Sequence, residues 1–166
     1  MAERIVVDLK GTLFDNHKRT PKFEKGLRSG LRDVAADITR DTQDKLQQGK
    51  RGFWRGQLRS SISFRQFSNL GFEIASGAAL GRQELTYAKY VEHGRRAGKM
   101  PPRSAIEQWA FAHGFTSQTV FLLQRAIGRR GTKGVHMFRD TADEWNRKTS
   151  QIRRTLSKSI KKELDK

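Results

Sequence analysis

The pattern of apolar and polar residues predicts short strands and longer amphipathic helices. Branched and large apolar residues fill most of residues 4–9, which favours a strand there. A helix should begin at Thr20 and Pro21, with Thr20 as the N-cap residue and Pro21 in the first helical position. Apolar residues then recur at spacings of three and four as far as Leu46, which predicts a helix of about seven turns ending near Gly49.

The second half of the chain predicts a hairpin and several shorter helices. Alternating apolar residues over 58–76 indicate an antiparallel hairpin that turns at Ser68 and Asn69. We expect a short helix over 86–93, a helix from a capping box at Ser104 to Gly114, a helix from Thr116 to Gly128, and a C-terminal helix that follows a capping box at Thr141.

These elements predict an α+β fold, in which a small antiparallel sheet packs on a long amphipathic helix and further helices follow. We expect one domain over residues 1–146 and a basic helical extension over residues 147–166. The last helix has a narrow apolar seam, and seven basic residues lie between Arg147 and Lys162 with no acidic residue among them. That seam suits packing on its own domain and contact with a neighbouring subunit equally well.

Charge and cysteine content restrict the possible partners. The net charge is +17, from 34 Lys and Arg against 17 Asp and Glu, and a chain this basic attracts polyanions. There is no cysteine, which excludes disulfides and thiolate metal sites. Because the sequence contains neither a long apolar run nor the layout of a secretory signal, we expect a protein that is made in a cytoplasm and does not enter a membrane.

Three basic clusters are candidate contacts for DNA or for a protein partner. Phe53 and Trp54 lie inside the first cluster, where aromatic rings could stack on bases. No motif for sequence-specific readout accompanies the clusters, so we expect contact with phosphates without base reading, or else a solvated basic face. The candidate residues are Lys50, Arg51, Arg55, Arg95, Arg96, Lys99, Arg103, Arg129, Arg130 and Lys133.

Nothing in the sequence favours catalysis. Asp8 after the first strand resembles the nucleophile of haloacid-dehalogenase-type phosphatases, but Lys10 stands where such enzymes carry a second aspartate. The four histidines are isolated from one another and lack metal-ligand spacing. We therefore predict no catalytic, cofactor-binding or metal-binding residue, and a phosphatase built on Asp8 is the enzymatic alternative.

Three segments carry a resemblance to a known family. They are Gly56-Gln-Leu-Arg-Ser-Ser-Ile62, Tyr87-Ala-Lys-Tyr-Val-Glu-His-Gly94, and the stretch from Gly131 to Ala142. In this order and spacing they resemble the head–tail joining, or tail-completion, proteins in the neck of long-tailed bacteriophages (minor tail protein Z-like). The residues that match the motifs or should pack beneath them are Leu58, Ile62, Tyr87, Tyr90, Glu92, Gly94, Pro101, Pro102 and Phe138.

The resemblance implies a structural protein of the virion, located in the neck between head and tail. Its partners would be copies of itself in a six- or twelve-fold ring, head connector or adaptor proteins, tail terminator or tail tube proteins, and packaged DNA in the lumen. It implies no catalysis and no cofactor. The alternative from the residues alone is a free-standing basic protein that binds nucleic acid without sequence preference.

Overall fold

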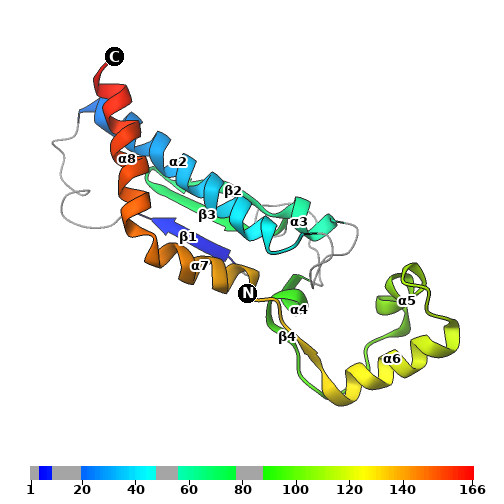
Figure 1. Ribbon diagram of the computed structural model, residues 1–166. Coiled ribbons are helices and arrows are strands. Elements are labelled where there is room, and N and C mark those ends of the chain that lie inside the picture. Colours follow the sequence, from blue (N-terminus) through cyan, green and yellow to red (C-terminus); the bar gives the residue numbers. More distant parts are fainter. Residues whose placement is uncertain (1–3, 9–19, 48–55, 78–87) are drawn as a thin grey trace. The chain divides into compact units, whose positions relative to one another are not determined.

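The computed structural model describes residues 4–8, 20–47, 56–77 and 88–166, which belong to two compact units (Figure 1). Unit 1 combines residues up to Thr86 with Met137–Lys166, and unit 2 comprises Tyr87–His136. The chain therefore leaves unit 1, forms unit 2, and returns to complete unit 1. The predicted boundary at residue 146 stays a prediction, since these two units divide the chain at other positions.

Unit 1 contains a three-stranded antiparallel sheet. Its strands are β1 (Arg4–Asp8), β2 (Ser63–Ser68) and β3 (Gly71–Ala75), in the order β1-β3-β2. All five residues of the central strand β3 are buried. The first strand is confirmed, but the hairpin begins only at Ser63, because Gln57–Ser61 forms a short helix, α3. Gly56 starts α3 in the left-handed conformation (φ 68°), and its carbonyl accepts a bond from Ser60 N.

The long helix α2 (Pro21–Asp44) packs on this sheet, as predicted. The Thr20 side chain caps it by accepting a hydrogen bond from Phe23 N at 3.3 Å. A continuous apolar stripe, which includes Leu27, Leu31 and Val34, is buried beneath the helix. The helix ends at Asp44 rather than near Gly49, and Leu46 N turns back to Gln43 O at 3.0 Å.

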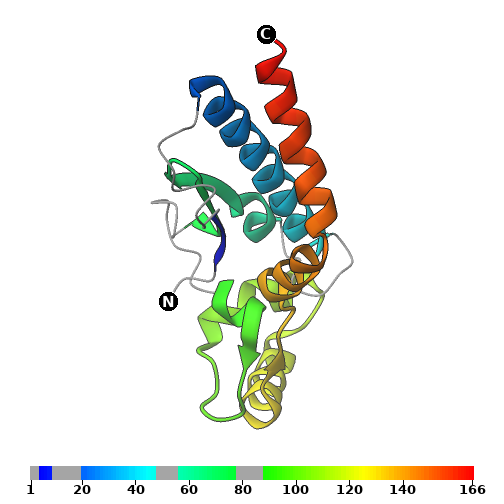
Figure 2. The same ribbon diagram turned by 90° about the vertical axis from the view of Figure 1, so that its left-hand side faces the viewer.

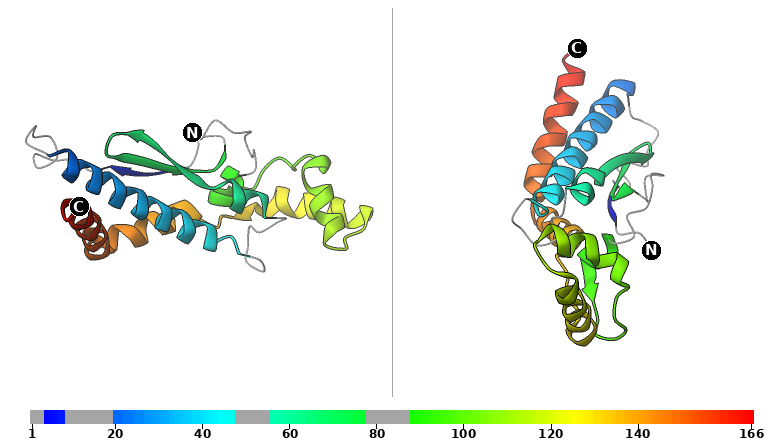
Figure 3. Two further views of the ribbon diagram at one scale, coloured as in Figure 1. Left: turned by 90° about the horizontal axis from the view of Figure 1, so that it is seen from above. Right: turned by 90° about the vertical axis from the view of Figure 1, so that its right-hand side faces the viewer.

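Helices α7 (Met137–Arg147) and α8 (Thr149–Leu164) complete unit 1. The predicted capping box at Thr141 is wrong, because Thr141 is a fully buried residue inside α7. Helix α8 lies along α2 in the opposite direction (Figures 2 and 3), so that Lys25 Nζ near the start of α2 is 3.1 Å from Glu163 Oε2. The apolar seam of the last helix therefore packs within its own unit.

Two glycines on α2 allow the α8 backbone to come close. A Cβ atom on Gly26 would lie 2.7 Å from Ile160 Cα, and one on Gly30 would lie 3.1 Å from Leu156 Cα. Any larger side chain at Gly26 would press directly against main-chain atoms. The two helices therefore meet backbone to backbone at this point, as they do at small-residue contacts elsewhere.

Unit 2 consists of short elements. Along the chain they are α4 (Ala88–His93), β4 (Gly94–Arg95), α5 (Arg103–Ala112), α6 (Ser117–Arg130) and β5 (Thr132–Lys133). Helix α4 confirms the helix expected over 86–93 within the described residues. The capping box at Ser104 is wrong, because α5 begins one residue earlier, after Pro102, and no side chain caps it. Helix α6 has the predicted cap at Thr116 but continues through Gly128 and stops at Gly131 (φ 68°).

The predicted fold class is thus confirmed. The chain is α+β, with a small antiparallel sheet packed on a long amphipathic helix and with further helices toward the C-terminus.

Candidate interaction surfaces

Much of the first predicted basic cluster lies outside the described residues, although Arg59 and Arg65 of that cluster are described and pair with Asp44 and Glu73. Its members outside the described residues are Lys50, Arg51 and Arg55, together with the aromatic pair at 53 and 54. Tyr87 of the family motif also lies outside the described residues. These predictions stay predictions.

The other two clusters come together at one end of unit 2. Strands β4 and β5 pair Gly94 with Lys133 and Arg95 with Thr132, and Gly98 N donates to Gly128 O at 2.7 Å. These contacts bring a loop after β4 to the C-terminal end of α6. We call the resulting surface the basic end of unit 2, and its residues are Arg95, Arg96, Lys99, Arg129, Arg130 and Lys133.

The basic end has a favourable structural setting of its own. Arg129 and Arg130 occupy the last turn of α6, where the helix dipole attracts positive charge. The Arg95 guanidinium donates to the Lys99 carbonyl and so holds the loop between them. Arg103, in contrast, stands apart at the start of α5, where its Nε lies 2.9 Å from Glu107 Oε1.

Glycine geometry explains part of the family-like motif. Gly94 has a φ of 73°, and a Cβ atom there would lie 2.2 Å from Thr132 O. Gly131 has a φ of 68°, and its Cβ atom would lie 2.0 Å from Arg95 O. A side chain at either position would be strained and would also force the two short strands apart. These two glycines are therefore required by the β4–β5 ladder.

The other motif residues divide by burial. Leu58, Ile62, Glu92, Pro101 and Phe138 are buried, whereas Pro102 is exposed. Tyr90 does not pack into a core as the sequence reading proposed, because 49% of its surface is exposed on α4. Its neighbour Lys89 lies over the ring, with Nζ 5.1 Å from the ring centroid.

Unit 2 also exposes large apolar side chains on its helices α5 and α6 and on the residues just after α5, which the sequence reading missed. We call this set the apolar tip, and it consists of Phe111, Phe115, Phe121 and Leu122, which are between 37% and 60% exposed. Trp109 supports it by stacking on Phe115, with ring centroids 5.9 Å apart. A usable signal was present, since Glu107 is the only Asp, Glu, Lys or Arg between Arg103 and Arg125 in a chain that is 31% charged.

A third surface, in unit 1, was also missed. Lys25, Arg28 and Arg32 line a groove between α2 and the β2–β3 hairpin. Their spacing of three and four residues places them on one face of the predicted helix, away from its buried stripe.

The described residues contain no group of three or more His, Asp or Glu side chains placed to hold a metal ion. Among the helices of the described ranges, none is long and apolar enough to cross a membrane. No protein family, curated protein or solved structure matches this chain.

Proposed function

We propose that the chain is a structural subunit of a bacteriophage neck, where copies form a ring that joins the DNA-filled head to the tail. The observation that carries the proposal is the apolar tip of unit 2. Exposed large apolar side chains that are concentrated in one small unit indicate a protein contact. A subunit that works by docking requires such a surface.

The net charge of the chain suits a second copy of the chain as the partner that binds the apolar tip. Copies that each carry a net charge of +17 repel one another wherever their basic faces meet. The tip is an uncharged surface that is large enough to bury aromatic rings. Contact between the tip and a different surface of the next copy is heterologous, and such contacts close into a ring when the rotation divides the circle.

The order of elements supports the family resemblance. The resemblance calls for a strand, a long amphipathic helix, a hairpin, the Tyr-Ala-x-Tyr-Val-Glu-x-Gly block, a Pro-Pro capped helix and a final helix. The described residues contain these elements in that order. In this proposal head connector proteins and tail proteins bind the faces of the ring, DNA occupies the lumen, and no reaction is catalysed.

Native mass tests the proposal. Full-length protein is treated with nuclease and measured by light scattering at about 0.1 M and about 1 M salt. A closed assembly of six or twelve protomers that survives both salt concentrations supports the ring. Phe121→Ser with Leu122→Ser should reduce the mass to that of a protomer. The matched control is Phe67→Ser, which changes a half-exposed phenylalanine of unit 1.

The basic end of unit 2 favours a second candidate function. Six cations meet there, and the only acidic residues of unit 2 are Glu92, which is buried, and Glu107, which is held by Arg103. A free-standing protein that binds nucleic acid without sequence preference would use this surface. A protomer that binds DNA at low salt and releases it at high salt, with no assembly in either, would support this function and contradict the ring.

A further inference from the structure

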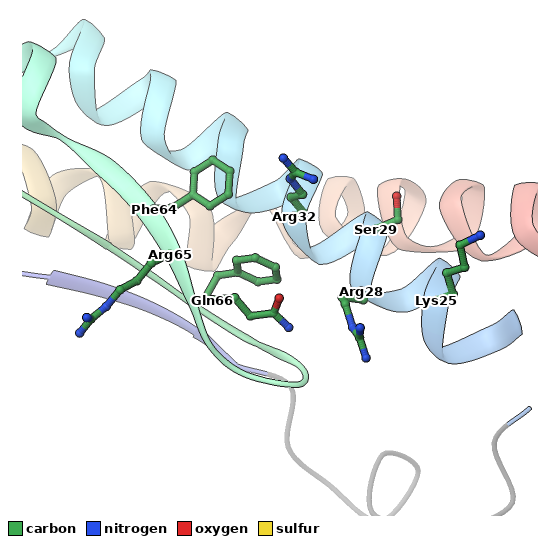
Figure 4. Close-up of a pocket in the computed structure, with 8 residues that line it drawn as sticks. Lys25, Arg28, Ser29, Arg32, Phe64, Arg65 and Gln66 are labelled. Atoms are coloured by element: carbon green, nitrogen blue, oxygen red, sulfur yellow. The ribbon is translucent and has the colours of Figure 1, made fainter. Parts of the chain in front are cut away.

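The groove in unit 1 combines positive charge with aromatic rings (Figure 4). It lies between the N-terminal half of α2 and the β2–β3 hairpin and encloses about 440 Å³. Of the eight residues that line it, four are Lys or Arg and none is Asp or Glu. A groove of this size accepts a small ligand or a short segment of a flexible polymer.

The charges of α2 are arranged in the order opposite to the one that stabilises a helix. Its first half, residues 21–32, has four basic residues and one acidic residue, and its second half, residues 33–44, has four acidic residues and one basic residue. The helix dipole favours the opposite order, with acids at the N-terminus and bases at the C-terminus. Arg28 and Arg32 also repel each other at i, i+4 spacing. Helix stability therefore does not explain why these cations are here.

The acidic half of α2 is largely neutralised within the chain. Asp41 accepts from Trp145 Nε1 at 2.8 Å and lies 3.6 Å from Lys148 Nζ. Asp44 lies 3.4 Å from an Arg59 nitrogen, and Asp37 pairs with Arg40. Three of the four acidic residues of this half thus have internal partners from α2, α3, α7 and Lys148, whereas in the described residues Asp33 accepts only from the neutral Ser159 Oγ.

The basic half of α2 lacks comparable neutralisation. Within the part of the chain that the structure describes, Arg32 has no acidic partner, and Arg28 donates only to the neutral side chain of Asn69 in the hairpin turn. Lys25 alone is paired, with Glu163, and its side chain remains 71% exposed. Arg65 lines the groove, but its guanidinium is held by Glu73 at 2.8 Å. Among the described residues, Arg28 and Arg32 therefore have no anionic partner.

We propose that this groove binds a segment of single-stranded nucleic acid. Lys25, Arg28 and Arg32 span seven helical residues, or about 10 Å, which allows them to meet successive phosphates along one strand. Phe64 is half-buried in the groove, with its ring centroid 6.0 Å from that of Phe72, and offers a surface on which one base stacks. In a duplex the bases stay stacked on one another, so no base stacks on Phe64.

The proposal concerns unit 1 and does not depend on the ring. It also names none of the basic residues that the sequence had offered as DNA contacts. Because any surface of this chain attracts polyanions, the test must separate the groove from the general charge of the protein. Charge-matched variants make that separation.

The test measures binding of fluorescent twelve-nucleotide dT and U strands by anisotropy over a series of salt concentrations, using nuclease-treated full-length protein. Arg28→Gln with Arg32→Gln removes two charges from the groove. Arg153→Gln with Arg154→Gln removes two charges from the exposed face of α8 and serves as the control. The double variant also loses the hydrogen bond between Arg28 and Asn69. If it unfolds at a lower temperature than the unchanged protein, Arg32→Gln alone takes its place, because that variant keeps the Arg28–Asn69 contact.

We expect the groove variant to bind at least one strand about tenfold more weakly, and its salt slope to fall by about 1.4, as the loss of two phosphate contacts predicts. The control should change affinity by less than about threefold. Phe64→Leu should weaken binding about fivefold with an unchanged salt slope, whereas Phe67→Leu, outside the groove, should not.

Three results would overturn the proposal. Equal losses in the groove and control variants would show that only general charge matters. A duplex that binds as tightly as the strand, with no effect of Phe64→Leu, would show a phosphate surface without a strand site. Displacement of the strand by poly-glutamate at equal charge concentration would point to an acidic protein as the occupant.

Discussion

The two units of the chain differ in how many of their apolar side chains are buried. Of the seventeen hydrophobic side chains that are buried in the described residues, fifteen lie in unit 1, and unit 2 contributes only Ala110 and Val120. Of the nine large hydrophobic side chains that are exposed, six lie in unit 2. Unit 1 therefore has a core of its own, whereas the described residues of unit 2 include more exposed large hydrophobic side chains than buried hydrophobic ones.

Under the proposed function, this difference locates the unit at which another molecule completes the chain. A unit with so few buried side chains gains little hydrophobic stabilisation from its own folding. Its geometry is held instead by glycine turns and the two-residue β4–β5 ladder. Binding of a partner at the apolar tip would bury the missing area, which is why the proposed function places the subunit contact in unit 2.

The largest effect should come from the core of unit 1. Leu31 on α2 is fully buried, and Leu31→Ala leaves a cavity that the sheet cannot close. We expect the free energy of unfolding to fall by about 3 kcal/mol. Urea denaturation followed by circular dichroism measures it. In unit 2, Val120→Ala should remove only about 1 to 2 kcal/mol from the stability of that unit. Equal losses would contradict the contrast between the two cores.

A smaller effect should come from the backbone of unit 2. Gly94→Ala places a Cβ atom 2.2 Å from Thr132 O on a residue with φ of 73°, and should destabilise the ladder by about 2 kcal/mol. Hydrogen exchange should accelerate at the amides of Val135 and His136, which bond to α4 carbonyls at 2.7 and 3.0 Å. Exchange in β3 should stay unchanged.

Gly114→Ala is the matched control for that ladder. Gly114 has a φ of 79°, but nothing lies within 4 Å of the added Cβ atom. The strained backbone of this variant should lower the free energy of unfolding by about 1 kcal/mol without opening the β4–β5 ladder. If both variants accelerated exchange at Val135 equally, the close contact with Thr132 would not be the cause.

The stability of unit 1 should depend on pH through Glu73 in its sheet. Burial alone would raise the pKa of Glu73, but hydrogen bonds from Arg65 at 2.8 Å and Arg4 at 3.0 Å outweigh it and hold the pKa below its ordinary value. Because the pKa is lower in the folded state, Glu73 stabilises the protein above the ordinary carboxyl pKa, and this contribution is lost as pH falls through the folded pKa.

Glu73→Gln tests this dependence. We expect the variant to be less stable by about 1 to 2 kcal/mol at neutral pH, with the difference shrinking below about pH 4. Thermal unfolding across this pH range measures the difference. A constant difference at every pH would show that the charge of Glu73 does not contribute.

The smallest effect on stability should come from the apolar tip. Phe111 is 49% exposed, so Phe111→Ser should change the free energy of unfolding of the protomer by less than about 0.5 kcal/mol. Self-association should nevertheless weaken, as sedimentation at several concentrations would show. A large loss of protomer stability would mean that the tip belongs to the core of unit 2 and is not a docking surface.

The sequence predicted the elements better than their ends. The cap at Thr20, the stripe beneath α2 and the strand at residues 4–8 follow from local rules, and the structure confirms them. The capping boxes at Ser104 and Thr141 failed because the neighbouring backbone was already helical, so that neither residue stands at a helix start. Such a pattern specifies a cap only where the preceding residue is extended.

The surfaces were harder to predict because they depend on contacts distant in sequence. Nothing local indicates that Arg95 and Lys133 lie on paired strands, or that the hairpin would place Phe64 opposite Arg32. The exposure of Phe111 and Phe121 was likewise hidden, since aromatic residues at helical spacing are more often buried. The low charge between Arg103 and Arg125, where Glu107 is the only charged residue, was the one sequence signal for the apolar tip.

The pairing of α2 with α8 has a consequence for the time at which this protein folds. Gly26 meets Ile160 across that contact, so α2 is without its partner while more than a hundred further residues are synthesised. At about 5 to 20 residues per second, translation of that stretch takes on the order of ten seconds. Unit 2 is synthesised before this wait ends, so its apolar tip precedes the finished unit 1. During synthesis, the apolar tip is therefore available to other proteins before α8 completes unit 1.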